Sequence, residues 1–332
     1  MRKLLKNLNK YTIALSALSA AALTNADILT SVRPLGFIAS SIADGITETQ
    51  VLIPAGASPH DYSMKPSDAK RVRDAEFVLW IGKDIDAFLE KSIAQRDATS
   101  VLTISKLAGI ESLLGETSAH DHDHDHDHDH DHDHDHDHDH DHDHDHDHDH
   151  DHDHHHSTNE LEQDWHVWFS PKISEQVAEQ LAQQLTQLYP QHQAKIATNL
   201  ETFKQQLTTT NQQITQQLAE FKDQGFYVFH DAYRYFENAY GLQQTGYFTI
   251  NPLIAPGAKK LAKIKEEINE HKVKCLFAEP QFTPKVLQTL QQSTNVKIGQ
   301  LDPMGEKIAL GKGSYSAFLQ QIAEDFSDCL KN

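Results

Sequence analysis

Long apolar segments are nearly absent from this chain of 332 residues. The one apolar run, residues 11–23, follows four basic residues and is too short to span a bilayer. The small or polar residues Thr24, Asn25 and Ala26 complete the pattern of a signal peptide, which we place at residues 1–26. No cysteine ends this run, which argues against a bacterial-type lipid anchor. We therefore predict an exported, soluble mature chain.

Cysteine is also scarce, with only Cys275 and Cys329 in the whole sequence. An even pair in an exported protein favours a disulfide. A bridge across this separation would contribute roughly 4 kcal/mol in the chain-entropy model. A metal site built on the two cysteines is the alternative, but the pair lacks CxxC spacing.

The chain also lacks an excess of basic residues. The formal net charge is -20, but 17 aspartates lie in one segment, between positions 121 and 153. The rest of the chain has 32 acidic residues against 29 Lys and Arg, so it is close to neutral. This balance argues against nucleic acid as a partner.

The acidic segment is a repeat of His and Asp that covers residues 120–156 and holds 20 of the 25 histidines. It contains no apolar residue to bury, so we predict a disordered insertion over residues 116–160. Imidazole is a common ligand for zinc, copper and nickel, and carboxylates add to such sites. The repeat is best interpreted as a tethered metal collector, with a solvated acidic spacer as the alternative.

The remaining chain alternates short β-rich runs with amphipathic helices, which predicts an α/β fold with mostly parallel sheets flanked by helices. We expect an N-terminal lobe over residues 27–189, a long rigid linking helix over 190–222, and a C-terminal lobe over 223–332. The first lobe should contain strands at 27–32, 49–53, 77–81 and 100–104, with helices at 34–45, 67–75 and 84–95. The second lobe should contain strands at 226–229, 275–278 and 296–301, and we also expect helices at 171–188 and 314–330.

Five histidines lie outside the repeat, and three of them occupy comparable positions. His60 lies in a loop after a predicted strand, His166 follows the repeat directly, and His230 ends a predicted strand. Ligands of open α/β sheets bind beyond the carboxyl ends of the strands. Each histidine alone could be an ordinary hydrogen-bonded loop residue, but together they predict one zinc-like site. His192 and His271 are interpreted as surface residues.

Three acidic residues also follow predicted strands. Asp302 is a candidate fourth metal ligand, or else caps the turn before Pro303. Asp231 is expected to be a helix N-cap, with support of the metal site as the alternative. Glu279 could line the cleft, and we do not predict that it coordinates metal.

Several motifs occur in order along the chain: GASPHDY (56–62), WHVWFSP (165–171), YVFHDAYRYFE (227–237), CLFAEPQF (275–282) and LDPMGEKIALGKGSYSAFL (301–319). With them the chain resembles the periplasmic zinc-binding component of high-affinity zinc ABC importers, the ZnuA family. The resemblance covers essentially the whole mature chain, including a His-rich insertion at the same point.

This resemblance implies two α/β lobes that hold Zn(II) in the cleft between them. It also implies a periplasmic protein that delivers zinc to a membrane permease powered by a separate ATPase. We expect this protein to be a monomer. Its zinc ligands correspond to His60, His166 and His230, and its cysteine pair to Cys275 and Cys329. Where the family can have a glutamate before the first histidine, this chain has Pro59, which leaves water or Asp302 as the fourth ligand.

The resemblance also bears on the metal and on the rival functions. Manganese-binding relatives have a carboxylate at the position of His230, whereas imidazole favours zinc, copper and nickel. A zinc hydrolase is a rival interpretation, but the chain has no HExxH-type signature. A zinc-buffering surface protein that works through the repeat is the third hypothesis. We predict a carrier and not an enzyme.

Overall fold

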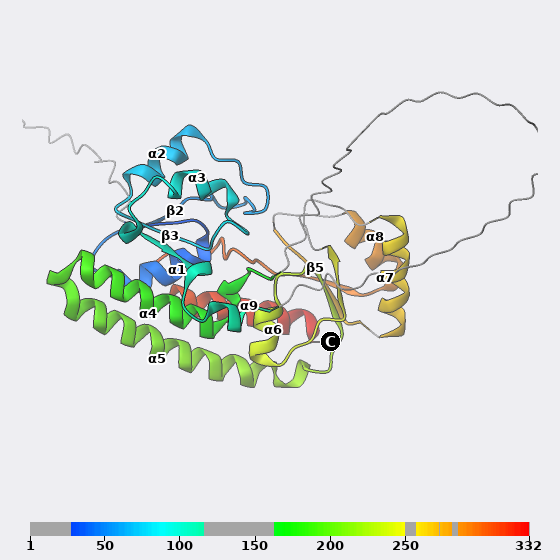
Figure 1. Cartoon of the computed structure of the whole chain (residues 1–332). Helices are drawn as coiled ribbons and strands as arrows, with labels where there is room; N and C mark the ends of the chain where they lie inside the picture. Colours follow the sequence, from blue (N-terminus) through cyan, green and yellow to red (C-terminus); the bar gives the residue numbers. More distant parts are fainter. Residues whose placement is uncertain (1–27, 116–162, 250–256, 272, 281–284, 332) are drawn as a thin grey trace, which may run out of the picture.

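The computed structural model describes residues 28–115, 163–249, 257–271, 273–280 and 285–331. The predicted signal peptide and the His/Asp repeat lie outside the described residues. The described chain forms two parallel four-stranded sheets flanked by helices (Figure 1), which confirms the predicted fold class. None of its helices combines the length and apolar character that crossing a bilayer requires.

The first sheet has the strand order β2-β1-β3-β4, and all its pairs are parallel. Parallel strands need crossover connections, so helices bury both faces of the sheet. In β3, Phe77 and Leu79 join the main core, while Val78 and Trp80 face a separate cluster beneath α2 and α3. The elements are β1 (Ile28–Thr30), α1 (Arg33–Ile42), β2 (Thr49–Val51), α2 (Pro66–Asp74), β3 (Phe77–Trp80), α3 (Glu90–Ile93) and β4 (Val101–Thr103).

The helix predicted at residues 84–95 is much shorter in the structure. Only Glu90–Ile93 is α-helical, after a 3-10 turn at Ala87–Leu89. Asp86 is the reason, because its buried carboxylate accepts a hydrogen bond from the Ile81 N–H at 2.9 Å. The chain therefore turns back toward β3 where the sequence pattern predicted a first helical turn.

The second sheet repeats this topology, with the order β6-β5-β7-β8 and parallel pairs throughout. A second apolar cluster fills the space between this sheet and α7 and α8. The elements are β5 (Phe226–His230), α6 (Arg234–Tyr240), β6 (Gly246–Thr249), α7 (Ala258–Glu270), β7 (Cys275–Ala278), α8 (Lys285–Thr294), β8 (Lys297–Gln300) and α9 (Ser314–Leu330).

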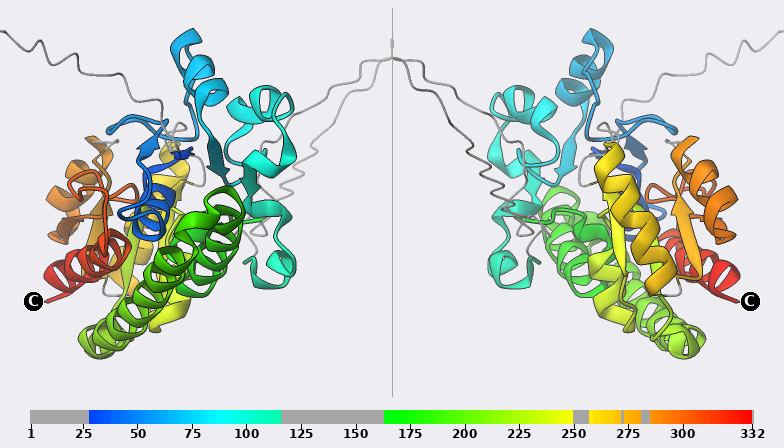
Figure 2. Two further views of the ribbon diagram at one scale, coloured as in Figure 1. Left: turned by 90° about the vertical axis from the view of Figure 1, so that its left-hand side faces the viewer. Right: turned by 90° about the vertical axis from the view of Figure 1, so that its right-hand side faces the viewer.

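Two long antiparallel helices, α4 (Pro171–Leu188) and α5 (Gln193–Leu218), run beneath both lobes. In both views of Figure 2 they lie on the side of the molecule away from α2. The predicted linking helix corresponds to α5, which has 26 residues and so a length of about 39 Å. Short 3-10 turns at Pro190–His192 and Ala219–Phe221 flank it.

The two lobes share one apolar core. The ring of Phe318 on α9 lies 5.5 Å from Phe37 on α1 and 5.5 Å from Phe169, which precedes α4. A disulfide joins Cys275 on β7 to Cys329 on α9, as predicted, with the Cα atoms 5.9 Å apart. The C-terminal helix is therefore fastened to the second sheet while it packs against the first lobe.

Candidate metal centre

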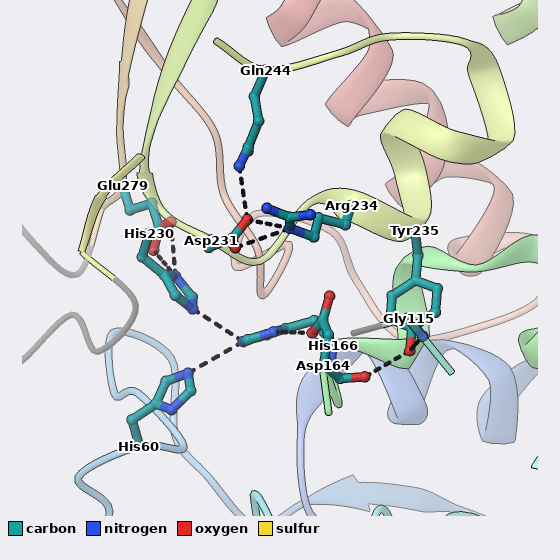
Figure 3. A network of polar contacts seen from close by, with 10 residues as sticks. All are labelled: His60, Gly115, Asp164, His166, His230, Asp231, Arg234, Tyr235, Gln244 and Glu279. Carbon is teal, nitrogen blue, oxygen red and sulfur yellow. Dashed lines mark hydrogen bonds and ion pairs between the residues drawn. The ribbon is translucent and has the colours of Figure 1, made fainter. Parts of the chain in front are cut away.

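Three histidines from distant parts of the chain meet between the lobes (Figure 3). His60 lies in the loop between β2 and α2, His166 precedes the 3-10 turn Val167–Phe169, and His230 is the last residue of β5. The Nε2 atom of His166 lies 3.3 Å from Nε2 of His60 and 3.0 Å from Nε2 of His230. The structure thus brings together all three histidines that the sequence singled out, and leaves His192 and His271 outside the group.

The spacing of these nitrogens fits one small cation. Zinc–imidazole bonds are about 2.0–2.1 Å long, so two nitrogens on a tetrahedral zinc lie about 3.3–3.4 Å apart. The two Nε2 separations from His166 come close to this length. One ligand nitrogen from each of the three rings lies within 4.8 Å of the other two, so a single cation could contact all three.

Buried carboxylates orient two of the rings through their other nitrogen. His166 Nδ1 lies 2.7 Å from Oδ1 of Asp164, and His230 Nδ1 lies 3.1 Å from Oε1 of Glu279. With Nδ1–H donating to a carboxylate, the lone pair of each ring is on Nε2. Two lone pairs then point toward each other across 3.0 Å, an arrangement that a shared cation stabilises.

The surroundings keep the imidazoles of His166 and His60 in their neutral, ligating form. Burial, together with repulsion from His230, lowers the pKa of His166 well below its usual value. Burial and the two neighbouring imidazoles do the same for the pKa of His60. Because a metal binds only the neutral ring, no proton has to be displaced from these two residues near pH 7.

The pKa of the Asp164 carboxyl depends on the charge beside it. Burial raises the pKa of its carboxyl to about 7, although the His166 backbone N–H donates to it at 2.9 Å. A divalent cation on His166 would lower this pKa again. Ionisation of Asp164 and cation binding therefore favour one another.

The third ring is held differently. No carboxylate contacts Nδ1 of His60 within the described residues, and the loop around it is largely exposed. Two contacts fix this loop: the His60 N–H donates to Oγ of Ser58, and the Gly56 N–H donates to Oε1 of Glu306 at 2.7 Å. Glu306 belongs to the other lobe, in the segment that links β8 to α9.

Asp302 does not join the three histidines. Its Oδ1 accepts from the N–H groups of Met304 and Gly305, each at 3.0 Å, and its Oδ2 accepts from Glu306 at 2.7 Å. It is absent from the histidine group and from the lining of the adjacent cavity. The carboxylate caps the turn around Pro303, which was the alternative role.

Two other acidic residues differ from the sequence expectations. Asp231 is not the N-cap of α6, because Tyr233 occupies that position. Its carboxylate instead accepts from Arg234 and Gln244, which fixes the chain directly after His230. Glu279 lines the cavity as expected, and in addition orients His230. Asp164 was missed, although an Asp two residues before a histidine can cap that residue's N–H.

The cavity at the rings is small, about 10 Å³. This space suits one ion or one water molecule. Apolar side chains supply much of the wall, so donor atoms are few apart from the imidazoles. The lining residues are Ser58, Pro59, His60, His166, Trp168, His230, Glu279, Pro303 and Met304.

Comparison with known proteins shows the family of this chain. A family model described as "Zinc-uptake complex component A periplasmic" matches residues 28–329. The high-affinity zinc uptake system protein ZnuA of Haemophilus influenzae is 58% identical, with 99% of each chain covered. The protein of the same name from Yersinia pestis is 43% identical, over 93% of this chain and 92% of its own.

Solved structures share the fold. A crystal structure of ZnuA has a TM-score of 0.70 at 21% identity and covers 93% of this chain and 100% of its own. The periplasmic zinc-binding protein TroA of Treponema pallidum has a TM-score of 0.70 at 18% identity, with the same coverage. The match to the family model and the identity to these sequence relatives show that the chain belongs to the ZnuA family of zinc-uptake components.

Proposed function

We propose that the protein is an extracytoplasmic zinc-binding protein that captures Zn(II) between its lobes and delivers it to an ABC importer. One observation carries the proposal: Nε2 of His166 lies 3.0 and 3.3 Å from its two partner nitrogens, beside carboxylates that hold two rings in the ligating form. Membership of the zinc-uptake family supports zinc as the cargo.

We assign His60, His166 and His230 as the zinc ligands. A water molecule is the fourth ligand in this proposal, because all three hydrogen bonds to Asp302 hold its carboxylate in the turn. Three imidazoles favour zinc and the other late first-row metals, copper and nickel, over manganese. Copper and nickel would bind as well in vitro, so metal supply contributes to selectivity in the cell.

The small cavity argues against the rival zinc hydrolase. A hydrolase needs room for a substrate and a general base beside the metal-bound water. The cavity of about 10 Å³ has no room for an organic substrate. Glu279, the carboxylate in its wall, is taken up by His230 and Tyr233, at 3.1 and 3.2 Å.

The signal peptide and the His/Asp repeat would determine where the protein works and how zinc reaches the cleft. Residues 1–26 would direct a monomeric protein to the periplasm, where a membrane permease accepts the zinc. The His/Asp repeat would bind further zinc weakly and raise its concentration near the cleft by tethering. The periplasmic family description supports this location.

Calorimetric zinc titration tests the proposal on three proteins: the intact mature chain, a variant lacking residues 120–156, and a variant with His60, His166 and His230 replaced by alanine. We expect one tight site and several weak sites in the intact chain. Deleting the repeat should remove only the weak sites, and the triple substitution only the tight one. His271→Ala is the matched control, because His271 is an exposed histidine outside the group. Tight binding that persists in the triple variant would rule out the assigned site.

A further inference from the structure

Tyr235 connects the second lobe to the chain segment that carries His166. It lies on α6, and its side chain is buried, with 7% exposure. Its hydroxyl donates to the backbone carbonyl of Asp164 at 2.6 Å and accepts from the Gly115 N–H at 3.0 Å (Figure 3). One hydroxyl thus contacts two points of the first lobe that are far apart in sequence.

Those two points are also bonded to each other. The Asp164 N–H donates to the Gly115 carbonyl at 3.1 Å. Gly115 is the last described residue before the insertion, and Asp164 is the second described residue after it. The described residues Gly115 and Asp164, which flank the insertion, are therefore hydrogen-bonded to each other, and Tyr235 contacts both from the other lobe. We call these three residues the clasp.

The same clasp positions a proposed zinc ligand. Oδ1 of Asp164 accepts both from the His166 backbone N–H at 2.9 Å and from Nδ1 of its ring at 2.7 Å. The Asp164 carbonyl, on the same residue, is the group that Tyr235 holds. A shift of the Asp164 backbone would therefore move the carboxylate that aims the His166 ring.

We propose that Tyr235 is a positioning residue for the metal site. It acts through Asp164 on His166 and links this ligand to Gly115, the last described residue before the His-rich insertion. The inference rests on the proposed role of His166 as a zinc ligand. The cleft site and the clasp formed by Gly115, Asp164 and Tyr235 are then energetically coupled. Zinc in the cleft should stabilise the clasp, and the clasp should strengthen zinc binding by the same factor.

Tyr235→Phe tests the positioning role in the full mature chain, because it removes the hydroxyl and keeps the ring. Loss of this hydrogen bond should lower zinc affinity at the cleft about threefold to tenfold, measured by competition with a chelator. Tyr240→Phe is the matched control, since Tyr240 is also on α6 and donates to Oδ1 of Asn211 at 2.6 Å, away from Asp164. It should leave zinc affinity unchanged. Equal affinities for wild type and Tyr235→Phe would overturn the proposal.

A double-mutant cycle separates positioning from a general structural effect. If Tyr235 acts through Asp164, then Tyr235→Phe should cause no further loss of affinity in an Asp164→Ala background. Full additivity of the two losses would overturn the proposed route.

Hydrogen exchange tests the coupling in the wild-type protein, with His60→Ala as the control. One equivalent of zinc should slow exchange of the Gly115 amide severalfold, and it should not do so in His60→Ala, which lacks one ligand. Exchange at Gly115 that ignores zinc in the wild type would contradict the coupling. Failure of the proposed function is a different outcome, namely tight zinc binding by the triple-histidine variant.

Discussion

At the scale of single residues, the three imidazoles differ in how they are oriented. Asp164 and Glu279 fix the rings of His166 and His230, whereas His60 relies on its loop. Partners of this kind typically contribute 10- to 100-fold to metal affinity. The energetics of the site therefore depend on residues that do not touch the metal.

Asp164→Ala should weaken zinc binding at the cleft by about 10- to 100-fold, because the His166 ring loses its hydrogen-bond partner. Chelator competition measures this loss. Asp86→Asn is the control, since Asp86 is a buried carboxylate in the same lobe that bonds the Ile81 N–H instead of a histidine. Wild-type affinity in Asp164→Ala would show that the carboxylate does not orient the ring.

Glu237 makes stability depend on pH. It is buried on α6, and its Oε1 has no hydrogen-bond partner within the described residues. Burial raises its pKa to about 8. The folded protein thus retains a proton that the unfolded chain releases above its usual pKa near 4.5. This contribution is complete below about pH 4.5 and is lost as the pH rises through about 8.

Glu237→Gln should remove that dependence, because the amide stays neutral. Urea unfolding of the metal-free protein at pH 5 and pH 8.5 should show a smaller loss of unfolding free energy for the variant. We expect a difference on the order of a few kcal/mol. The exposed Glu220→Gln should behave as wild type. Parallel pH profiles for Glu237→Gln and wild type would refute this role.

The sequence was sufficient to predict that the three histidines lie together, since two of them follow strands at the carboxyl edges of their sheets. It was not sufficient for their partners. Asp164 adjoins a low-complexity repeat, and its contact with His166 depends on the local turn. Asp302 follows a strand as well, yet the turn at Pro303 engages its carboxylate. Local backbone geometry decides such cases, and residue type does not reveal it.

At the scale of elements, the loop from β2 to α2 reaches the other lobe in two ways. The ring of His60 packs against that of His230, and the Gly56 N–H donates to Glu306. Glu306→Ala should speed zinc release about threefold to tenfold, through loss of one charge-assisted hydrogen bond. Stopped-flow release into a chelator measures this rate. The exposed neighbour Lys307→Ala is the control, and an unchanged rate in Glu306→Ala would contradict the role of this contact.

The disulfide should stabilise the protein without affecting zinc binding at the cleft. Replacing Cys275 and Cys329 together with alanine should cost roughly 4 kcal/mol, since the bridge closes a long loop. Thermal unfolding would report the loss, while zinc affinity should stay at the wild-type value. Equal stability of the variant and the parent would show that packing alone holds α9 on β7.

Element boundaries were predictable where apolar periodicity and capping agreed. The ranges of α4 and α9 match the expected residues 171–188 and 314–330, and β7 matches 275–278. Ser170 caps α4 through its hydroxyl, and Pro171 occupies the first turn, so the start of that helix is explicit in the sequence. The segment after β3 lacked such agreement, because a buried Asp86 competes with helix formation there.

At the scale of the whole molecule, the two sheets have the same strand order and face a common helical layer. Their carboxyl edges provide His60 and His230 from opposite lobes, and the chain after the insertion adds His166. The alternation of strands and helices was enough to predict both lobes. It could not predict that α1, α5 and α9 form one core that spans them, because contacts between distant helices leave no local pattern.

In the proposed function, three imidazoles from both lobes bind one zinc ion. The most direct test is a crystal structure of the zinc-loaded protein with anomalous diffraction at the zinc edge. We predict a strong peak about 2.0–2.1 Å from Nε2 of His60, His166 and His230. Crystals saturated with zinc that show no peak among these rings would rule out the histidine site.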